Sequence, residues 1–169
     1  MSQWERDLTF REAFHLSCVP CYQEVARAVG VEKMITFLKT LSYGSISVDE
    51  ATIDIFWLQG KSSINQMQQI DFLKRFYLSE LSISKRTEDI MKKLMIIEEK
   101  DGYKLSGKTG WSIQNDINNG WFVGYIEKES NTYFFATNVE PLETFNMDNF
   151  PSIRKEVTYS ALEQMKIID

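Results

Sequence analysis

Apolar residues recur at helical spacing through the first half of the chain. Between residues 31 and 41 they stand at Met34, Ile35, Leu38 and Leu41, which places them on one side of an α-helix. Pro20 fits the first turn of the helix before this one. The pattern predicts helices over residues 5–16, 20–29, 31–41, 64–77 and 85–95, the last two capped by Ser62 or Ser63 and by Ser84.

From Ile96 onward the pattern changes to an alternation of apolar and polar residues, which is typical of half-buried strands. Pro151 and Ser152 then begin a final helix over residues 153–165. The predicted strands cover residues 97–99, a short one, and 103–112, 121–127 and 133–139, with a hairpin loop at 129–131. A helical region, a three-stranded antiparallel sheet and a C-terminal helix in this order predict an α+β fold. We expect one domain over residues 1–169.

Composition excludes several classes of protein. The 169 residues are enough for one sizeable core, and a hydrophobic content of 43% predicts a folded chain. The net charge of −5 argues against a nucleic-acid partner. No apolar run is long enough for a transmembrane segment and no signal peptide begins the chain, so we expect a soluble protein as given.

The triplet Lys108-Thr109-Gly110 interrupts the alternation of a predicted strand. Lys108 and Gly110 would share one face, and Gly110, which has no Cβ, would let a ligand lie close to the strand. A cation, a hydroxyl and a strand edge suit a peptide-like ligand that carries a carboxylate, and Lys-Thr-Gly is a mark of penicillin-recognising serine enzymes. The alternative is an exposed strand end with a solvated lysine.

Cys18 and Cys21 form a C-x-x-C motif with Pro20 between them. Next to a helix start such a pair can be redox-active, but the apolar helix that follows favours two packed thiols or one local disulfide. His15 is the only histidine of the chain, which excludes a His-rich zinc site and a Ser-His-Asp triad.

Several motifs together resemble the class D (oxacillin-hydrolysing) serine β-lactamases and the related sensor domains of β-lactam receptors, which have a β-lactamase/transpeptidase-like fold. The resemblance extends from Trp4 to Ile168. Its motifs are Ser17-Cys18-Val19, Tyr43-Gly44-Ser45, Phe56-Trp57-Leu58-Gln59-Gly60, Lys108-Thr109-Gly110, Gly120-Trp121-Phe122-Val123-Gly124-Tyr125 and Arg154. Ser45 departs from the family, which usually has asparagine there.

The resemblance implies catalytic roles for three residues of the first half. In the family a carbamylated lysine is the general base. Trp57 would hydrogen-bond its carbamate, Val19 would cover it, and Ser17 would relay a proton to the leaving nitrogen. The residues alone leave two other interpretations open: a core aromatic side chain for Trp57, and a helix N-cap for Ser17.

The resemblance also implies substrate-binding roles for residues in the second half of the chain. Lys108 would supply positive potential, Thr109 a hydroxyl for the substrate carboxylate, and Gly110 the space beside the strand. Arg154 would bind the same carboxylate with two N–H donors, and the backbone N–H of Trp111 would be one oxyanion-hole donor. The alternative for Arg154 is a solvated helix arginine. No metal or other cofactor is implied.

The family's nucleophile, a Ser-x-x-Lys upstream of Ser17, is absent, and so are the N-terminal strands that complete its sheet. Ser82-Ile83-Ser84-Lys85 has the right letters, but it follows motifs that it should precede and is interpreted as a helix cap. We therefore expect a domain that is truncated on its N-terminal side and has an uncovered sheet edge.

Three functions remain open. The first is a hydrolase that binds a small-molecule β-lactam and hydrolyses it through an acyl-enzyme in the full-length form, with this chain alone inactive. The second is a sensor domain that is acylated without turnover. The third is a non-catalytic relative that self-associates through its sheet edge. In the family such proteins work outside the cell, in the periplasm or at the cell envelope.

Overall fold

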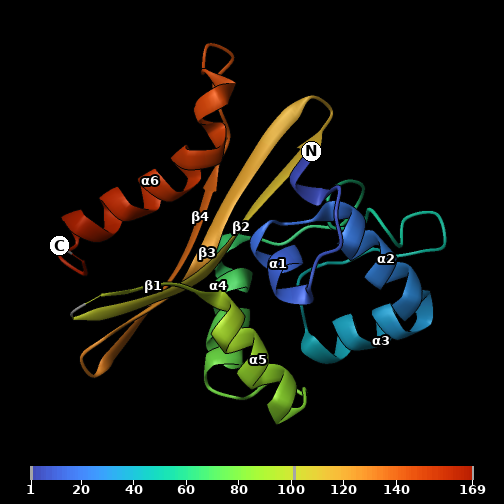
Figure 1. Cartoon of the computed structure of the whole chain (residues 1–169), viewed down its shortest axis with the longest axis horizontal. Coiled ribbons are helices and arrows are strands. Elements are labelled where there is room, and N and C mark those ends of the chain that lie inside the picture. The colour runs from blue at the N-terminus through green and yellow to red at the C-terminus, as the bar shows by residue number, and fades with distance from the viewer. Residues whose placement is uncertain (1, 101, 169) are drawn as a thin grey trace. The chain divides into compact units, whose positions relative to one another are not determined.

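The computed structural model describes residues 2–100 and 102–168, and the chain divides into two compact units, Met1–Ile64 and Asn65–Asp169 (Figure 1). Each unit is described by itself, and a single domain over the whole chain stays a prediction. The first unit contains η1 (Ser2–Trp4), α1 (Phe10–His15), α2 (Val19–Val29) and α3 (Val31–Leu41). The second contains α4 (Gln66–Tyr77), α5 (Lys85–Met95), β1 (Ile96–Lys100), β2 (Tyr103–Gln114), β3 (Ile117–Lys128), β4 (Asn131–Val139), η2 (Met147–Asn149) and α6 (Phe150–Gln164).

Helix α1 is shorter than predicted because a capping box fixes its start. The Thr9 hydroxyl accepts the Glu12 backbone N–H at 3.3 Å, and the Glu12 carboxylate accepts the Thr9 N–H at 2.8 Å. The helix therefore begins at Phe10, although apolar spacing extends further towards the N-terminus.

The start of α4 also differs from the prediction. Ser63 forms an isolated antiparallel bridge with Ser45, and the Ser62 hydroxyl bonds to the backbone of Ser47, so neither serine caps the helix. Asn65 is the N-cap, and its side chain accepts the Gln68 N–H at 2.9 Å.

The sheet has four antiparallel strands in the order β1-β2-β3-β4, so the predicted number of three is corrected. The short strand candidate is β1, and it pairs with β2 from Lys100↔Tyr103 to Ile96↔Ser106. The predicted succession of helices, antiparallel sheet and closing helix is confirmed, and so is the α+β class.

A hairpin turn that we did not predict joins β2 to β3. Asn115 and Asp116 both have positive φ, 51° and 62°, as a two-residue turn between twisted strands requires. The strands on either side are consequently longer than predicted, running on to Gln114 and starting again at Ile117.

Helices α4 and α6 cover opposite faces of the sheet. On one face, Tyr77 of α4 makes edge contacts with Tyr125 and Phe134, with ring centroids 5.0 and 5.7 Å apart. On the other, Tyr159 of α6 lies near Phe122 of β3. The buried core on the α6 face consists of Leu105, Phe122, Ile126, Leu162, Ile167 and Ile168. Among the described residues, no helix combines the length and apolarity needed to cross a bilayer.

A buried carboxylate fixes α5 in the second unit. Glu88 is 4% exposed and accepts hydrogen bonds from Ser79 (2.6 Å), Lys85 (3.0 Å) and Lys92 (2.7 Å). The hydrogen bonds from Lys92, Ser79 and Lys85 lower the pKa of Glu88 to about 2. Lys92 also donates to the Tyr77 carbonyl at the end of α4, so this network connects the two helices.

Candidate active site

Among the described residues, the second half of β2 has a strand on one side only. Pairing with β1 stops at Ser106, because α5 ends at Met95 immediately before β1. From Gly107 onward, β3 is the only strand paired with β2 in the part of the chain that the structure describes. The Lys-Thr-Gly triplet lies in this half of the strand, where a ligand could approach a backbone edge.

Lys108 lies on this part of β2 and is half-buried. Its Nζ donates to the Thr109 carbonyl at 2.9 Å. Burial, with smaller contributions from the positive charges of Arg154 and Lys155, lowers the pKa of Lys108 to about 8. Lys108 is therefore not the solvated lysine of the alternative interpretation, but a cation in a partly dry and positive environment.

Arg154 connects α6 to the same strand. Its Nη1 donates to the Gly110 carbonyl at 2.6 Å and its Nη2 to the Pro151 carbonyl at 3.1 Å. The guanidinium lies 5.8 Å from the centroid of the Trp111 ring, and the residue is 9% exposed. Its Nε has no hydrogen-bond partner among the described residues. Arg154 is thus a buried cation at β2 and not a solvated helix arginine.

Gly120, which begins one of the family-like motifs but was not predicted as a site residue, makes room for Arg154. It pairs with Trp111, and a Cβ at this position would lie 2.8 Å from Arg154 Cγ and Cδ and from Phe150 Cζ. Asn118 was missed as well, and its Oδ1 accepts the Trp111 Nε1–H at 2.9 Å. The register of the β2–β3 hairpin is the signal that would have indicated both residues.

Thr109 and Gly110 lie on opposite faces of β2. Thr109 pairs with Phe122, whose side chain is on the α6 face, whereas Lys108 and Gly110 share the other face, as predicted. Among the described residues other than its chain neighbours, a Cβ on Gly110 would meet only Trp121 Cβ, at 3.6 Å, which is an ordinary contact.

Ser17 and Val19 stand at the junction between α1 and α2 in the first unit. Ser17 has a positive φ of 49°, and its N–H donates to the Phe14 carbonyl at 3.2 Å. The alternative interpretation of Ser17 as a helix N-cap is wrong, because Cys18 is the N-cap of α2 and its Sγ accepts the Cys21 N–H at 3.3 Å. Cys18 and Cys21 form a disulfide, the second of the two states that we expected.

Trp57 lies in a series of turns and is half-buried next to Phe56, with ring centroids 5.1 Å apart. Within these turns the Thr52 carbonyl accepts the N–H groups of Ile55 and Phe56. Arg27 of α2 forms an ion pair with Asp54, which attaches these turns to α2.

The structure therefore brings Lys108, Thr109, Gly110, Trp111 and Arg154 together within the second unit. In the first unit, Ser17 and Val19 are neighbours at the start of α2, and Trp57 stands in a separate segment. The convergence of the two groups into one cleft stays a prediction.

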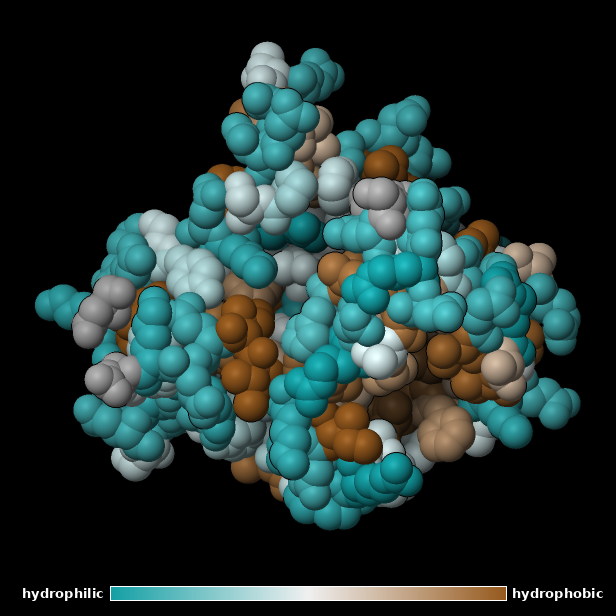
Figure 2. Space-filling model, in the orientation of Figure 1, coloured by the Kyte–Doolittle hydropathy of each residue, from teal (hydrophilic) through white to brown (hydrophobic). Residues whose placement is uncertain are grey.

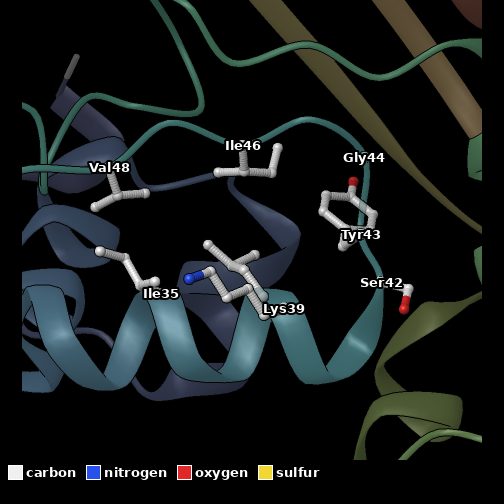
Figure 3. A pocket seen from close by; sticks show the side chains of 8 residues that line it. Ile35, Lys39, Ser42, Tyr43, Gly44, Ile46 and Val48 are labelled. Atoms are coloured by element: carbon white, nitrogen blue, oxygen red, sulfur yellow. The ribbon is translucent and has the colours of Figure 1, made fainter.

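A pocket of about 260 Å³ opens in the first unit, and none of the predicted site residues lines it (Figure 3). The side chains of Ile35 and Lys39 point from α3 towards the segment that contains Ile46 and Val48. Tyr43 and Gly44 lie at one end of the pocket. The space-filling view shows hydrophobic side chains gathered over α3 (Figure 2). The pocket is lined by Ile35, Leu38, Lys39, Ser42, Tyr43, Gly44, Ile46 and Val48. No three His, Cys, Asp or Glu side chains come together as metal ligands among the described residues.

We predict that Lys108 loses its charge near pH 8 in the folded chain, whereas a free lysine does so near pH 10.5. The folded chain releases this proton first, so the free energy of unfolding should rise with pH between the two values, and attraction for anions should fall. NMR titration of the side chain measures this pKa. Arg154→Gln should raise it, and Lys93→Gln, an exposed change on α5, should not. A pKa near 10.5 in the unmodified chain would contradict the prediction.

Comparisons with known proteins identify the family of the chain. Residues 1–163 match the family model described as penicillin binding protein transpeptidase domain. Beta-lactamase OXA-10 of Pseudomonas aeruginosa is 40% identical over 99% of this chain and 62% of its own length. The chain thus spans about 62% of the length of this curated relative.

Two solved structures are similar over nearly the whole chain. The class D β-lactamase YbXI from Nostoc is 42% identical with a TM-score of 0.90, over 98% of this chain and 68% of that one. The class D β-lactamase from Sebaldella termitidis is 36% identical with a TM-score of 0.92, over 100% of this chain and 68% of that one. The chain therefore belongs to the penicillin-binding transpeptidase-domain family and, within it, to the class D β-lactamases.

Proposed function

We propose that this chain is the β-lactam-recognising part of a class D serine β-lactamase. The observation that carries the proposal is the positive charge next to the second half of β2, where Arg154 donates to the Gly110 carbonyl and Lys108 has a lowered pKa. The charges of Lys108, Arg154 and Lys155 attract an acidic ligand to this part of the strand.

In this proposal the substrate lies along β2 with its carboxylate at Lys108, Thr109 and Arg154. The Trp111 backbone N–H supports the lactam carbonyl as charge develops on its oxygen. For the first half of the chain we propose the roles that the resemblance implies. Trp57 would hydrogen-bond the carbamate of the general base and Val19 would cover it. Ser17 would relay a proton to the leaving nitrogen.

We propose that the chain alone does not hydrolyse β-lactams. Ser84 of the Ser82–Lys85 segment is the N-cap of α5, and Lys85 is exposed and paired with Glu88 and Asp89 at 3.0 Å. These acidic partners raise the pKa of Lys85, which is the opposite of what a general base needs. The acyl-enzyme would need the family's Ser-x-x-Lys.

The proposal extends to partners and location. The β4 edge pairs with no second strand among the described residues, so self-association by strand addition would occur there. We place the protein's action in an extracellular or cell-envelope compartment, as the family implies. The disulfide fits an oxidising compartment of this kind.

The test uses the 169-residue chain with benzylpenicillin and its methyl ester, which lacks the carboxylate. We expect the acid to shift the backbone amide NMR signals of residues 108–111 and the ester to shift them far less. Equal shifts with both compounds, or shifts confined to other segments, would refute the proposed site.

The same samples separate the alternative functions. Mass spectrometry should show no acyl adduct, and a chromogenic cephalosporin should not be hydrolysed. A stable adduct without turnover would favour the sensor function, and turnover would refute the predicted inactivity. A concentration-dependent oligomer that binds no β-lactam would favour the non-catalytic relative.

A further inference from the structure

The Cys18–Cys21 disulfide joins residues only three positions apart, across the first turn of α2. A disulfide stabilises a protein mainly by restricting the unfolded chain, and the effect is smallest for short loops. The start of α2 also has Pro20 within its first turn, which favours a helix N-terminus without a cross-link. Stabilisation alone therefore explains little of this bond.

The two cysteines differ in exposure. Cys18 is 1% exposed, whereas Cys21 is half-buried. Thiol–disulfide exchange requires a thiolate to reach one sulfur in line with the bond, so access favours attack at Cys21.

The sulfur that would leave, Cys18 Sγ, is also the one whose thiolate its surroundings stabilise better. Cys18 is the N-cap of an eleven-residue helix, and its Sγ already accepts the Cys21 N–H at 3.3 Å. The first turn of α2 contains no acidic residue to oppose a negative charge there. A hydrogen-bond donor and the positive end of a helix stabilise a thiolate, and a more stable thiolate leaves faster.

We propose that the Cys18–Cys21 disulfide is a thiol-exchange site that reacts with small external thiols at Cys21. The incoming thiolate forms a new S–S bond to Cys21 Sγ, the original S–S bond breaks, and its electron pair leaves on Cys18 Sγ. A second thiolate then attacks the mixed disulfide, which frees Cys21 and oxidises two external thiols to their disulfide. The reaction opens the disulfide between Cys18 and Cys21, directly after Ser17 in the chain. It does not depend on the proposed β-lactam function.

The test treats the folded chain with excess reduced glutathione, quenches with acid, alkylates the free thiols and maps the adduct by peptide mass spectrometry. We expect glutathione on Cys21 over Cys18 by at least about tenfold, because access and leaving group favour the same sulfur. The same chain in urea is the matched control, and there the two cysteines should react almost equally.

Three results would overturn the proposal. The first is a ratio of Cys21 to Cys18 adduct that is the same in the folded chain and in urea. The second is a preference for Cys18. The third is the absence of any adduct in the folded chain under conditions in which glutathione opens the disulfide of the unfolded chain. Cys18→Ser/Cys21→Ser confirms that any adduct found is at these residues, since this variant should carry none.

Discussion

Gly124→Ala is expected to lower the free energy of unfolding by about 3 kcal/mol or more, the largest effect on stability that we predict. A Cβ on Gly124 would lie 2.1 Å from the Ser106 carbonyl oxygen, 2.7 Å from Gly107 Cα and 2.8 Å from Phe135 Cζ. Two of these atoms belong to the backbone of β2, so relief of the clash requires the strands to separate. Urea denaturation followed by circular dichroism measures the loss.

Gly110→Ala is the matched control in the same hairpin. Its Cβ would lie 3.6 Å from Trp121 Cβ, an ordinary contact, and we expect a change below about 1 kcal/mol. Similar losses for the two variants would mean that β2 and β3 are not packed as closely at Gly124 as the structure indicates.

Arg154→Ala is expected to weaken the binding of benzylpenicillin about 10- to 100-fold, the range that a hydrogen bond to a charged group supplies. This is the largest effect on binding that we predict, and it rests on the proposed function. The change removes a buried cation from the Gly110 carbonyl, to which Nη1 donates at 2.6 Å. The dissociation constant comes from the shifts of the residue 108–111 amides.

Two further variants test whether the positive charge of residue 154 is enough, or whether the planar guanidinium is needed. Arg154→Lys keeps a positive charge but loses the planar pair of donors, so it should recover only part of the affinity. Lys93→Ala removes an exposed cation from α5 and should leave the dissociation constant unchanged. The same affinity in Arg154→Ala as in the unmodified chain would remove Arg154 from the binding site.

Helices with clear end signals were the easiest part of the fold to predict. Gly30 and Ser84 stand directly before α3 and α5, and both helices begin as predicted. The start of α1 was misplaced because apolar spacing continues past it, while the hydrogen bonds between Thr9 and Glu12 decide where the helix begins. Periodicity locates a helix, and local capping sets its ends.

The β2–β3 turn was missed because it contains no glycine. Asn115 and Asp116 adopt the positive φ values that such a turn needs, and their side chains tolerate this conformation better than most. Without the turn, the register that places Gly120 opposite Trp111 could not be derived.

Alternation along one strand predicted that Lys108 and Gly110 share a face, because this depends on local geometry alone. The bond from Arg154 to the Gly110 carbonyl joins residues 44 positions apart and depends on where α6 crosses the sheet. The pairing of Cys18 with Cys21 was expected only as one of two states, since spacing permits a bond without requiring it.

The absence of a loop between Met95 and Ile96 restricts how this chain can vary in length. One residue added at this junction would invert the side chains of β1, exchanging those that face the core with those that face solvent. The solvent-exposed Asn115–Asp116 turn can lengthen without disturbing the pairs behind it. Natural insertions and deletions should therefore be rare at the junction and more frequent at the turn, where extra residues leave the strand pairs in place.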